Sequence, residues 1–326
     1  MSWTLYRSTD PDAPVLTGAV GGLTNVLRKC LVDGYSSGLT AKIAAGWVEP
    51  FTGTNKAVFR PGAAASSRQF YRVGHAAEDG DASICRIQGF DAMSSVDAGT
   101  GPFPLSAPCY PRVSDTSSGT ARAWIVAADD RTCIFFVRNG NGVNGSRWLM
   151  TYFGEIFSFV PDDPYSGGVF GPWDGYGDTD TVTLKKGNTA WNNVGVGNVS
   201  LARNYNGAPG AVLAGLSVFA PMVVPQSSQY GVAVRGRVAT ANPADGKAWL
   251  GEILVVTSAV SNCIRGRLRG LTHPLVALDA FADGDTITDH TGKAHVYLRT
   301  RTRDWSDSAT EFTSHLFLET TPPGHN

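Results

Sequence analysis

The sequence predicts a mainly β protein, with antiparallel sheets in a sandwich or barrel-like arrangement and one amphipathic α-helix near the N-terminus. Two observations lead to this fold class. Apolar residues recur every three or four positions in one early segment, whereas the later apolar segments alternate with a period of two. Glycine and proline are also frequent, at 38 and 18 residues, which suits an all-β chain with many turns.

The helix is predicted from an apolar stripe that precedes Gly34. Its members are spaced by three and four residues and therefore share one helix face: Leu16, Val20, Leu23, Leu27 and Leu31. Gly34 supplies the expected stop. Gly18, Gly21 and Gly22 each lower the helix propensity by about 1 kcal/mol relative to alanine, so we expect the helix to pack on a sheet.

Five segments after the helix are predicted as strands, because they alternate and are rich in aromatic and β-branched residues: 69–73, 83–87, 121–127, 132–137 and 148–160. Asp129 and Asp130 mark a hairpin turn between the third and the fourth of these strands. Residues 139–145 contain three Asn-Gly steps, which favour positive φ, and are therefore expected to form an exposed loop.

A second β-rich half is predicted after residues 161–180, a stretch rich in Asp, Gly, Pro and Tyr that suits a long connection. The expected domains are residues 1–170, with the helix and the first strands, and residues 171–326, in agreement with usual domain lengths. The strands predicted in the second half are 212–224, 230–239, 249–257, 264–271, 295–302 and 315–319. No fixed-period repeat occurs in the sequence, which argues against a repetitive fibre shaft.

The composition argues against several function classes. Charged residues make up 17% of the chain, and 27 Lys plus Arg nearly cancel 28 Asp plus Glu, so no strong field is available to hold nucleic acid. The first residues do not resemble a secretion signal, and no stretch approaches the ~18 apolar residues that span a bilayer. We therefore expect an unprocessed, soluble protein without a membrane partner. Five widely spaced cysteines without a CxxC pair are expected to be reduced, mostly buried thiols, as in a protein made in the cytoplasm.

Catalytic and metal-binding motifs are not recognisable in the sequence. The GYSSG phrase at 34–38 matches the G-x-S-x-G pattern of hydrolases, but it follows a helix, which favours a helix-ending turn over a catalytic Ser36. Six scattered histidines lack metal-ligand spacing. The Asp clusters at 174–180 and 283–289 lack the ligand order of an EF-hand, and Asp is also common in turns. We therefore expect no catalytic residue, no metal site and no cofactor.

Two groups of alternating arginines are the sharpest candidates for a protein interface. In strands, each group would project from one face, and guanidinium groups are well shaped to bind carboxylates of a neighbouring subunit. The alternative is two solvated strand faces whose arginines pair with aspartates of the same chain. The candidate interface residues are Arg265, Arg267, Arg269, Arg299, Arg301 and Arg303.

Aromatic residues in and beside the 161–180 connection are candidates for contact with a glycan. The chain has eight Trp and ten Tyr residues, and most of them are expected in the core. Those in the connection have less strand core to enter, and an exposed ring can stack on a sugar. The candidate glycan contacts are Tyr165, Phe170, Trp173 and Tyr176.

Several phrases along the chain are longer and more specific than single motifs. They are AAGW (44–47), FTGTNKA (51–57), GTGPFP (99–104), RGRLRGL (265–271), APVLTGAVGGL (13–23), FDAMSSVDAGTGPFP (90–104), WLMTYFGEIFSF (148–159) and DGDT (283–286). Together these phrases resemble a family of structural proteins from tailed-bacteriophage virions. The resemblance implies a virion structural or tail-associated protein without an assigned enzymatic activity, and it transfers no site residues. In the family pattern, proline is more usual than arginine at the position of Arg269, which implies an arginine group particular to this chain.

The resemblance and the lack of an active-site motif together predict a non-enzymatic component of a tailed-phage virion, made in the host bacterial cytoplasm and placed in the tail, baseplate or collar. Its partners are expected to be other virion proteins and further copies of itself in a symmetric array. Capsid decoration is the second placement. A carbohydrate-binding or receptor-binding module that contacts a host-surface glycan is the competing class, and a glycan hydrolase comes third.

Overall fold

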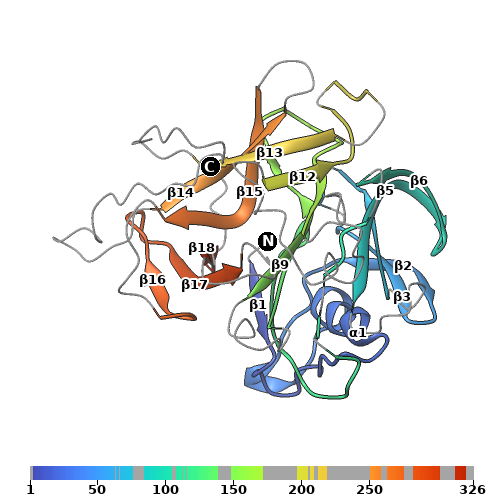
Figure 1. Cartoon of the computed structure of the whole chain (residues 1–326), viewed down its shortest axis with the longest axis vertical. Coiled ribbons are helices and arrows are strands. Elements are labelled where there is room, and N and C mark those ends of the chain that lie inside the picture. The colour runs from blue at the N-terminus through green and yellow to red at the C-terminus, as the bar shows by residue number, and fades with distance from the viewer. Residues whose placement is uncertain are drawn as a thin grey trace, which may run out of the picture.

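The structure is a computed structural model of the whole chain, drawn in Figure 1. It describes residues 3–62, 64–65, 67–75, 84–104, 108–111, 113–114, 116–138, 148–171, 197–204, 206–208, 212–218, 250–257, 263–274, 282–301 and 313–320. The fold is mainly β, as predicted, and all strand pairs among these residues are antiparallel.

Thirteen strands of the described residues form the larger sheet. In chain order they are β1 (Thr4–Arg7), β7 (Ala123–Ala128), β8 (Thr132–Arg138), β9 (Leu149–Glu155), β10 (Phe157–Ser158), β11 (Gly167–Phe170), β12 (Gly197–Leu201), β13 (Val212–Val218), β14 (Leu250–Thr257), β15 (Cys263–Pro274), β16 (Thr286–Thr288), β17 (Ala294–Arg301) and β18 (Thr313–Glu319). Their order in the sheet is β1, β7, β8, β9, β11, β12, β13, β14, β15, β18, β17, β16. β10 pairs with the part of β15 whose other edge pairs with β14.

The smaller sheet is a five-stranded meander. It consists of β2 (Val48–Gly53), β3 (Lys56–Arg60), β4 (Phe70–His75), β5 (Cys85–Ser95) and β6 (Ala98–Phe103), paired in that order, and a 3-10 turn (Gly38–Thr40) precedes it. Asn55 adopts a φ of 58° in the turn between β2 and β3, as asparagine commonly does in tight turns. Figure 1 shows this sheet on the right of the molecule, next to the single described α-helix, α1 (Gly22–Arg28).

Two hydrophobic cores cover the two faces of β7, β8 and β9. The first core fills the space between these strands, the smaller sheet and α1, and includes Phe59, Tyr71 and Phe135. The second core lies on the opposite face, where β14, β15, β17 and β18 pack, and includes Phe136 and Leu298. β7, β8 and β9 are therefore buried on both faces, which explains their nearly continuous apolar sequences. The arrangement is sandwich-like, and the described strands of the larger sheet end at β1 and β16 without closing a barrel.

The predicted helix is confirmed in its C-terminal part. α1 covers Gly22–Arg28 and continues as a π-helical turn, Lys29–Asp33, and it packs on the sheets as expected. Gly34 ends it with a φ of 77°, a conformation that glycine adopts without a side-chain clash. The expected start near Leu16 is wrong. Leu16 forms a β-bridge with Arg122, because the glycine-rich segment before α1 bonds to the chain that leads into β7.

Most of the predicted strands are present. β4, β5, β7, β8 and the pair β9 and β10 fall on the segments predicted in the first half, and the expected hairpin joins β7 to β8. β13, β14, β15, β17 and β18 fall on segments predicted in the second half. The sequence did not predict β1, β2, β3, β6, β11, β12 or β16, which are short or rich in glycine. The loop expected at 139–145 and the strand expected at 230–239 lie outside the described residues.

The division of the chain into two domains near residue 170 stays a prediction. β11 lies before this boundary and β12 after it, and the two strands pair in the larger sheet. β10, from the first half, likewise pairs with β15 from the second. Any domains at this boundary therefore share one sheet.

β15 curves strongly in Figure 1. The pairing of β15 with β14 is interrupted between Arg267 and Thr272, an interval that contains Gly270 with a φ of 70°. The Trp3 indole packs against this glycine, where an added Cβ would lie 2.5 Å from Trp3 Cζ2. The bend of β15 therefore needs glycine at this position.

We expect Gly270→Ala to lower the free energy of unfolding by more than about 2 kcal/mol, because the new Cβ adds a clash with Trp3 to the cost of a positive φ. Gly292→Ala is the matched control, since Gly292 has a φ of 88° and no atom within 4 Å of its added Cβ. The control should lose about 1 kcal/mol. Urea unfolding followed by tryptophan fluorescence measures both variants, and equal losses would contradict the packing role of Gly270.

Candidate functional site

β15 carries three arginines, and the structure does not place them on one face as the alternation predicted. Val255 of β14 pairs with Gly266, but Val256 pairs with Ile264, so Arg265 is an extra residue in a β-bulge. An extra residue shifts the alternation of side chains by one position. The bulge therefore turns Arg265 into the protein, where its side chain is fully buried.

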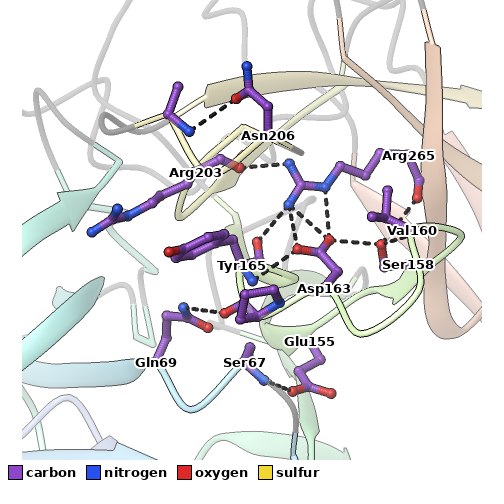
Figure 2. Close-up of polar contacts among 12 residues, drawn as sticks. Ser67, Gln69, Glu155, Ser158, Val160, Asp163, Tyr165, Arg203, Asn206 and Arg265 are labelled. Carbon is purple, nitrogen blue, oxygen red and sulfur yellow. Dashed lines mark hydrogen bonds and ion pairs between the residues drawn. The ribbon is translucent and has the colours of Figure 1, made fainter.

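Arg265 lies at the centre of the polar cluster in Figure 2. Its Nε and Nη2 atoms each donate a hydrogen bond of 3.0 Å to the Asp163 carboxylate, one to each oxygen. Nη1 donates to the backbone carbonyl of Arg203 at 2.7 Å, and Nη2 also donates to that of Tyr165 at 3.1 Å. All three guanidinium nitrogens are thus used inside the chain. The assignment of Arg265 to a protein interface is therefore wrong.

The loop between β10 and β11 fixes Asp163 in turn. Oδ1 accepts a hydrogen bond from the Tyr165 backbone N–H at 2.9 Å, and Oδ2 accepts one from the Ser158 hydroxyl at 2.8 Å. Asp163 precedes Arg265 by 102 residues. The buried ion pair therefore ties a loop of the first half of the chain to a strand of the second half.

Arg269 forms a second internal ion pair, with the buried carboxylate of Asp129. Asp129 lies in the turn between β7 and β8, where its Oδ1 accepts hydrogen bonds from the backbone N–H groups of Arg131 and Thr132 at 2.9 and 2.8 Å. Its backbone carbonyl accepts a hydrogen bond of 2.7 Å from the Trp47 indole. This pair holds Arg269 within its own chain, with 16% of its side chain still exposed, and its assignment to an interface stays a prediction.

The second arginine group does not join the first. Arg299 and Arg301 lie in β17, and Arg303 lies outside the described residues. Arg299 pairs with His315 of β18, whereas β15 meets β18 at Leu271 and the residue after it. In this register, Arg299 lies level with the C-terminal end of β15, away from the three arginines of that strand. The role of this second group in an interface stays a prediction.

One face of β10, β14 and β15 points away from the second core, and we refer to it as the outward face. Ile253 and Val255 of β14 are buried in the core, so the residues that alternate with them project outward. Arg267 pairs with Leu254 of β14 and with Phe157 of β10, and therefore shares their side. The outward face consists of Phe157, Phe159, Glu252, Leu254, Val256, Ile264 and Arg267.

The bulge places Ile264 on the outward face. Ile264 and Arg267 are three residues apart, and in a regular strand an odd separation would put them on opposite faces. The extra residue, Arg265, restores them to the same side, so that Ile264 pairs with the outward-facing Val256. The bulge that buries Arg265 therefore also exposes the Ile264 side chain, on the same face as Arg267.

Arg267 joins the aromatic and the charged parts of the outward face. Its Cζ atom lies 4.7 Å from the centroid of the Phe157 ring, and its guanidinium group pairs with Glu252. The Phe157 and Phe159 rings meet edge to face, with centroids 6.0 Å apart. Of the three arginines of β15, Arg267 is the most accessible, with 37% of its side chain exposed. It remains a candidate interface residue.

The glycan-contact candidates have different environments. Phe170 is completely buried in the second core, so its assignment to a surface contact is wrong. Tyr165 is half-buried, and the Arg203 guanidinium lies over its ring, 4.8 Å from the centroid. Trp173 and Tyr176 lie outside the described residues, so their contact with a glycan stays a prediction.

The remaining motifs form no active-site geometry in the part of the chain that the structure describes. The Ser36 hydroxyl lies in a turn after the helix, 3.1 Å from the Pro11 carbonyl oxygen and 3.1 Å from Asp12 Oδ2. Asp283 accepts a hydrogen bond of 2.9 Å from the Trp148 indole and pairs with Arg138. No group of three or more His, Cys, Asp or Glu residues among the described ones has the geometry of a metal site.

Four cysteines in the first half of the chain are buried and free, and their environment makes them poor nucleophiles. Cys30, Cys85, Cys109 and Cys133 all lie inside the protein. Burial raises the pKa of the Cys85 and Cys109 thiols to about 12. These groups therefore stay protonated near neutral pH, and the reactive thiolate is scarce.

Asp289 and His295 form a buried polar pair, with His295 Nε2 lying 3.0 Å from Asp289 Oδ2. Burial alone would raise the pKa of the Asp289 carboxyl, but hydrogen bonds from Thr291, the Lys293 backbone N–H and His295 outweigh burial and lower the pKa to about 2. Burial also lowers the pKa of His295, against the opposing effect of Asp289. The pair is a structural contact that favours a charged carboxylate and a neutral imidazole.

Comparison with known proteins adds no family assignment. No protein-family model matches the sequence. No curated protein matches it either. Within the described residues, none of the helical segments has the length and apolar character needed to cross a bilayer.

Sequence reasoning missed the acids that hold β15 and most of the outward face. Asp163 and Asp129 look like ordinary turn residues, because their arginine partners are more than a hundred positions away. The alternation of Phe157 and Phe159 around a serine was a usable signal, since it places two aromatic rings on one side of a strand. The pairing of Glu252 with Arg267 depends on the register of two strands and had no local signal.

We expect Asp163→Asn to lower the free energy of unfolding by about 3 to 5 kcal/mol, because it leaves the Arg265 charge buried without a counter-charge. The double variant Asp163→Leu with Arg265→Met should be more stable than Asp163→Asn, since it leaves no unpaired charge. Asp33→Asn, which breaks an exposed pair with Lys29, is the control and should lose less than about 1 kcal/mol. Urea unfolding measures all three, and a loss for Asp163→Asn no larger than the control's would contradict the role of the buried pair.

We expect acid to destabilise the protein partly through Asp289. Its folded pKa of about 2 lies below the ordinary value of 3.8, so its contribution is complete above about pH 4 and is lost as the pH falls toward 2. Asp289→Asn should therefore flatten the dependence of unfolding free energy on pH between about 4 and 2. Chemical unfolding at a series of pH values measures this slope, and a slope equal to that of the unchanged protein would refute the assignment.

Proposed function

We propose that this chain is a non-enzymatic structural component of a tailed-phage virion that docks to neighbouring subunits in the tail, baseplate or collar. The phrases that resemble virion proteins support the virion setting. The observation that carries the docking role is the outward face, where exposed phenylalanine and isoleucine side chains gather around an accessible arginine. Contiguous exposed apolar surface with a polar margin is typical of interaction sites.

The buried acids favour a scaffold over an enzyme. Asp163 and Asp129 hold arginines of β15, and the Glu155 carboxylate accepts a hydrogen bond of 2.5 Å from the Ser67 backbone N–H. A catalytic acid or base must come within hydrogen-bond reach of its substrate. These three carboxylates are enclosed by their own chain and bonded to it, which suits a rigid support for surface contacts.

A second group of exposed apolar residues lies in the segments around α1. Leu39 in the 3-10 turn is completely exposed, and Ile43 and Val15 are also largely exposed. These side chains belong to the first half of the chain, whereas most of the outward face belongs to the second half. Two separate apolar regions suit a subunit that contacts a different neighbour with each.

Recognition of a host-surface glycan is the second candidate function. The exposed edge-to-face pair of Phe157 and Phe159 favours it, since aromatic faces can lie against the apolar face of a sugar ring. Glu252 and Arg267 beside the rings could bond to sugar hydroxyl groups. Binding of the purified protein to an array of host polysaccharides would support this function, and loss of binding in Phe159→Ser would locate it.

Mass spectrometry of purified particles, separated into heads and tails, tests the virion proposal. We expect the chain to be enriched with tails at a few to a few dozen copies per particle, because closed symmetric rings contain small numbers of subunits. Host cytoplasmic proteins in the same preparations define the background. Enrichment on heads at far higher copy number would support capsid decoration, and absence from particles would contradict the proposal.

A further inference from the structure

We infer that the outward face binds a second copy of this chain, in a two-fold contact that uses the same face of both copies. The inference deepens the proposed assembly role and rests on it. Three features of the face support it: an apolar centre, a charge pattern that is its own complement, and a rigid attachment to the rest of the fold.

The apolar centre consists of large side chains from adjacent strands. Phe157 of β10 is 39% exposed, Phe159 just after β10 is 49% exposed, and Ile264 of β15 is 52% exposed. Leu254 and Val256 of β14 are half-buried on the same side. Aromatic residues and arginine dominate the binding energy of many interfaces, and here both occur together. A partner with matching apolar surface would remove these groups from water.

The charges of the outward face are self-complementary. Arg267 and Glu252 lie side by side in contact, so the face carries one positive and one negative group. A two-fold axis brings each group against the same face of the partner, and Arg267 of one copy can then meet Glu252 of the other. A partner with charge of a single sign would attract one of these groups and repel the other. The charge pattern therefore favours a second copy over an unrelated acidic or basic protein.

The bulge at Arg265 holds the face in place. The Phe159 backbone N–H donates a hydrogen bond of 2.7 Å to the Arg265 carbonyl, and the Arg265 side chain is bonded to Asp163 in the loop after β10. Ser158, between the two phenylalanines, also bonds to Asp163. The segment that carries the two exposed rings is therefore bonded both to β15 and to the loop that follows β10. A surface that is fixed before binding loses little conformational entropy when a partner docks.

Sedimentation of the purified full-length chain tests the inference with two charge variants. Glu252→Arg gives a face with positive charge alone, and Arg267→Glu gives a face with negative charge alone. Each variant by itself should self-associate at least about tenfold more weakly than the unchanged protein, because like charges then face each other. An equimolar mixture of the two should recover association, because each positive face then meets a negative one. A pair that acts only within one chain predicts no recovery on mixing.

Two further variants keep the test independent of folding. Phe159→Ser removes an exposed ring without touching the internal ion pairs, and should weaken association by about tenfold. Asp33→Arg changes an exposed charge near α1 and should leave association unchanged. Circular dichroism verifies that each variant is folded. A monomeric unchanged protein, or a mixture that does not recover association, would overturn the inference.

The outcome separates this inference from the proposed function. Recovery on mixing together with absence of the chain from particles would leave the self-contact standing and remove the virion role. Presence in particles together with a strictly monomeric protein would support the virion role and overturn the self-contact. If Phe159→Ser abolishes binding to polysaccharide but leaves sedimentation unchanged, the outward face is a glycan site and the self-contact is wrong.

Discussion

The buried ion pair between Arg265 and Asp163 is the constraint on which the arrangement of the strands depends. Removing two charges from water costs several kcal/mol per ion, and their attraction compensates for this cost only when further hydrogen bonds satisfy both groups. Here the backbone carbonyls of Arg203 and Tyr165 accept the remaining hydrogen bonds of the guanidinium group. The Ser158 hydroxyl and the Tyr165 backbone N–H donate hydrogen bonds to the carboxylate. The loop after β10 must therefore meet β15 in one geometry, and this geometry fixes β10 along the edge of β15.

The ion pair of Arg269 with Asp129 is a second internal contact that holds β15. It joins β15 to the turn between β7 and β8, and the same turn accepts a hydrogen bond from Trp47, just before the smaller sheet. β15 is thus held at two points, one on each side of Arg267. Between these two points the strand has little freedom to rotate. The ion pairs of Arg265 and Arg269 therefore determine that the Arg267 side chain lies on the outward face. Internal packing in this way shapes an external surface.

Strands could be predicted from the sequence where the local pattern of apolar residues itself stabilises the strand. β7 and β8 were predictable because long runs of aromatic and β-branched residues suit strands buried on both faces. β6 was not, because AGTGPF is an exposed strand held by pairing with β5 and has no apolar pattern. The three arginines of β15 were misplaced for a different reason. Their alternation is real, but a bulge adds one residue, and the contact with Asp163 that accompanies the bulge lies 102 positions away.

Arg265 and Arg267 lie in the same strand but have opposite roles, because the first is buried away from water and the second is exposed to it. Breaking the pair of Arg265 with Asp163 would leave a bare charge in the interior, so this pair cannot be exchanged for contacts with another molecule. The pair of Arg267 with Glu252 is exposed and contributes little to the stability of a single chain, because water screens such pairs. It can therefore be exchanged at low cost, and burial in a contact would strengthen it by excluding water. A chain built in this way keeps the charges that stabilise its fold apart from the charges that water reaches, so that the proposed contact through the outward face would not compete with folding.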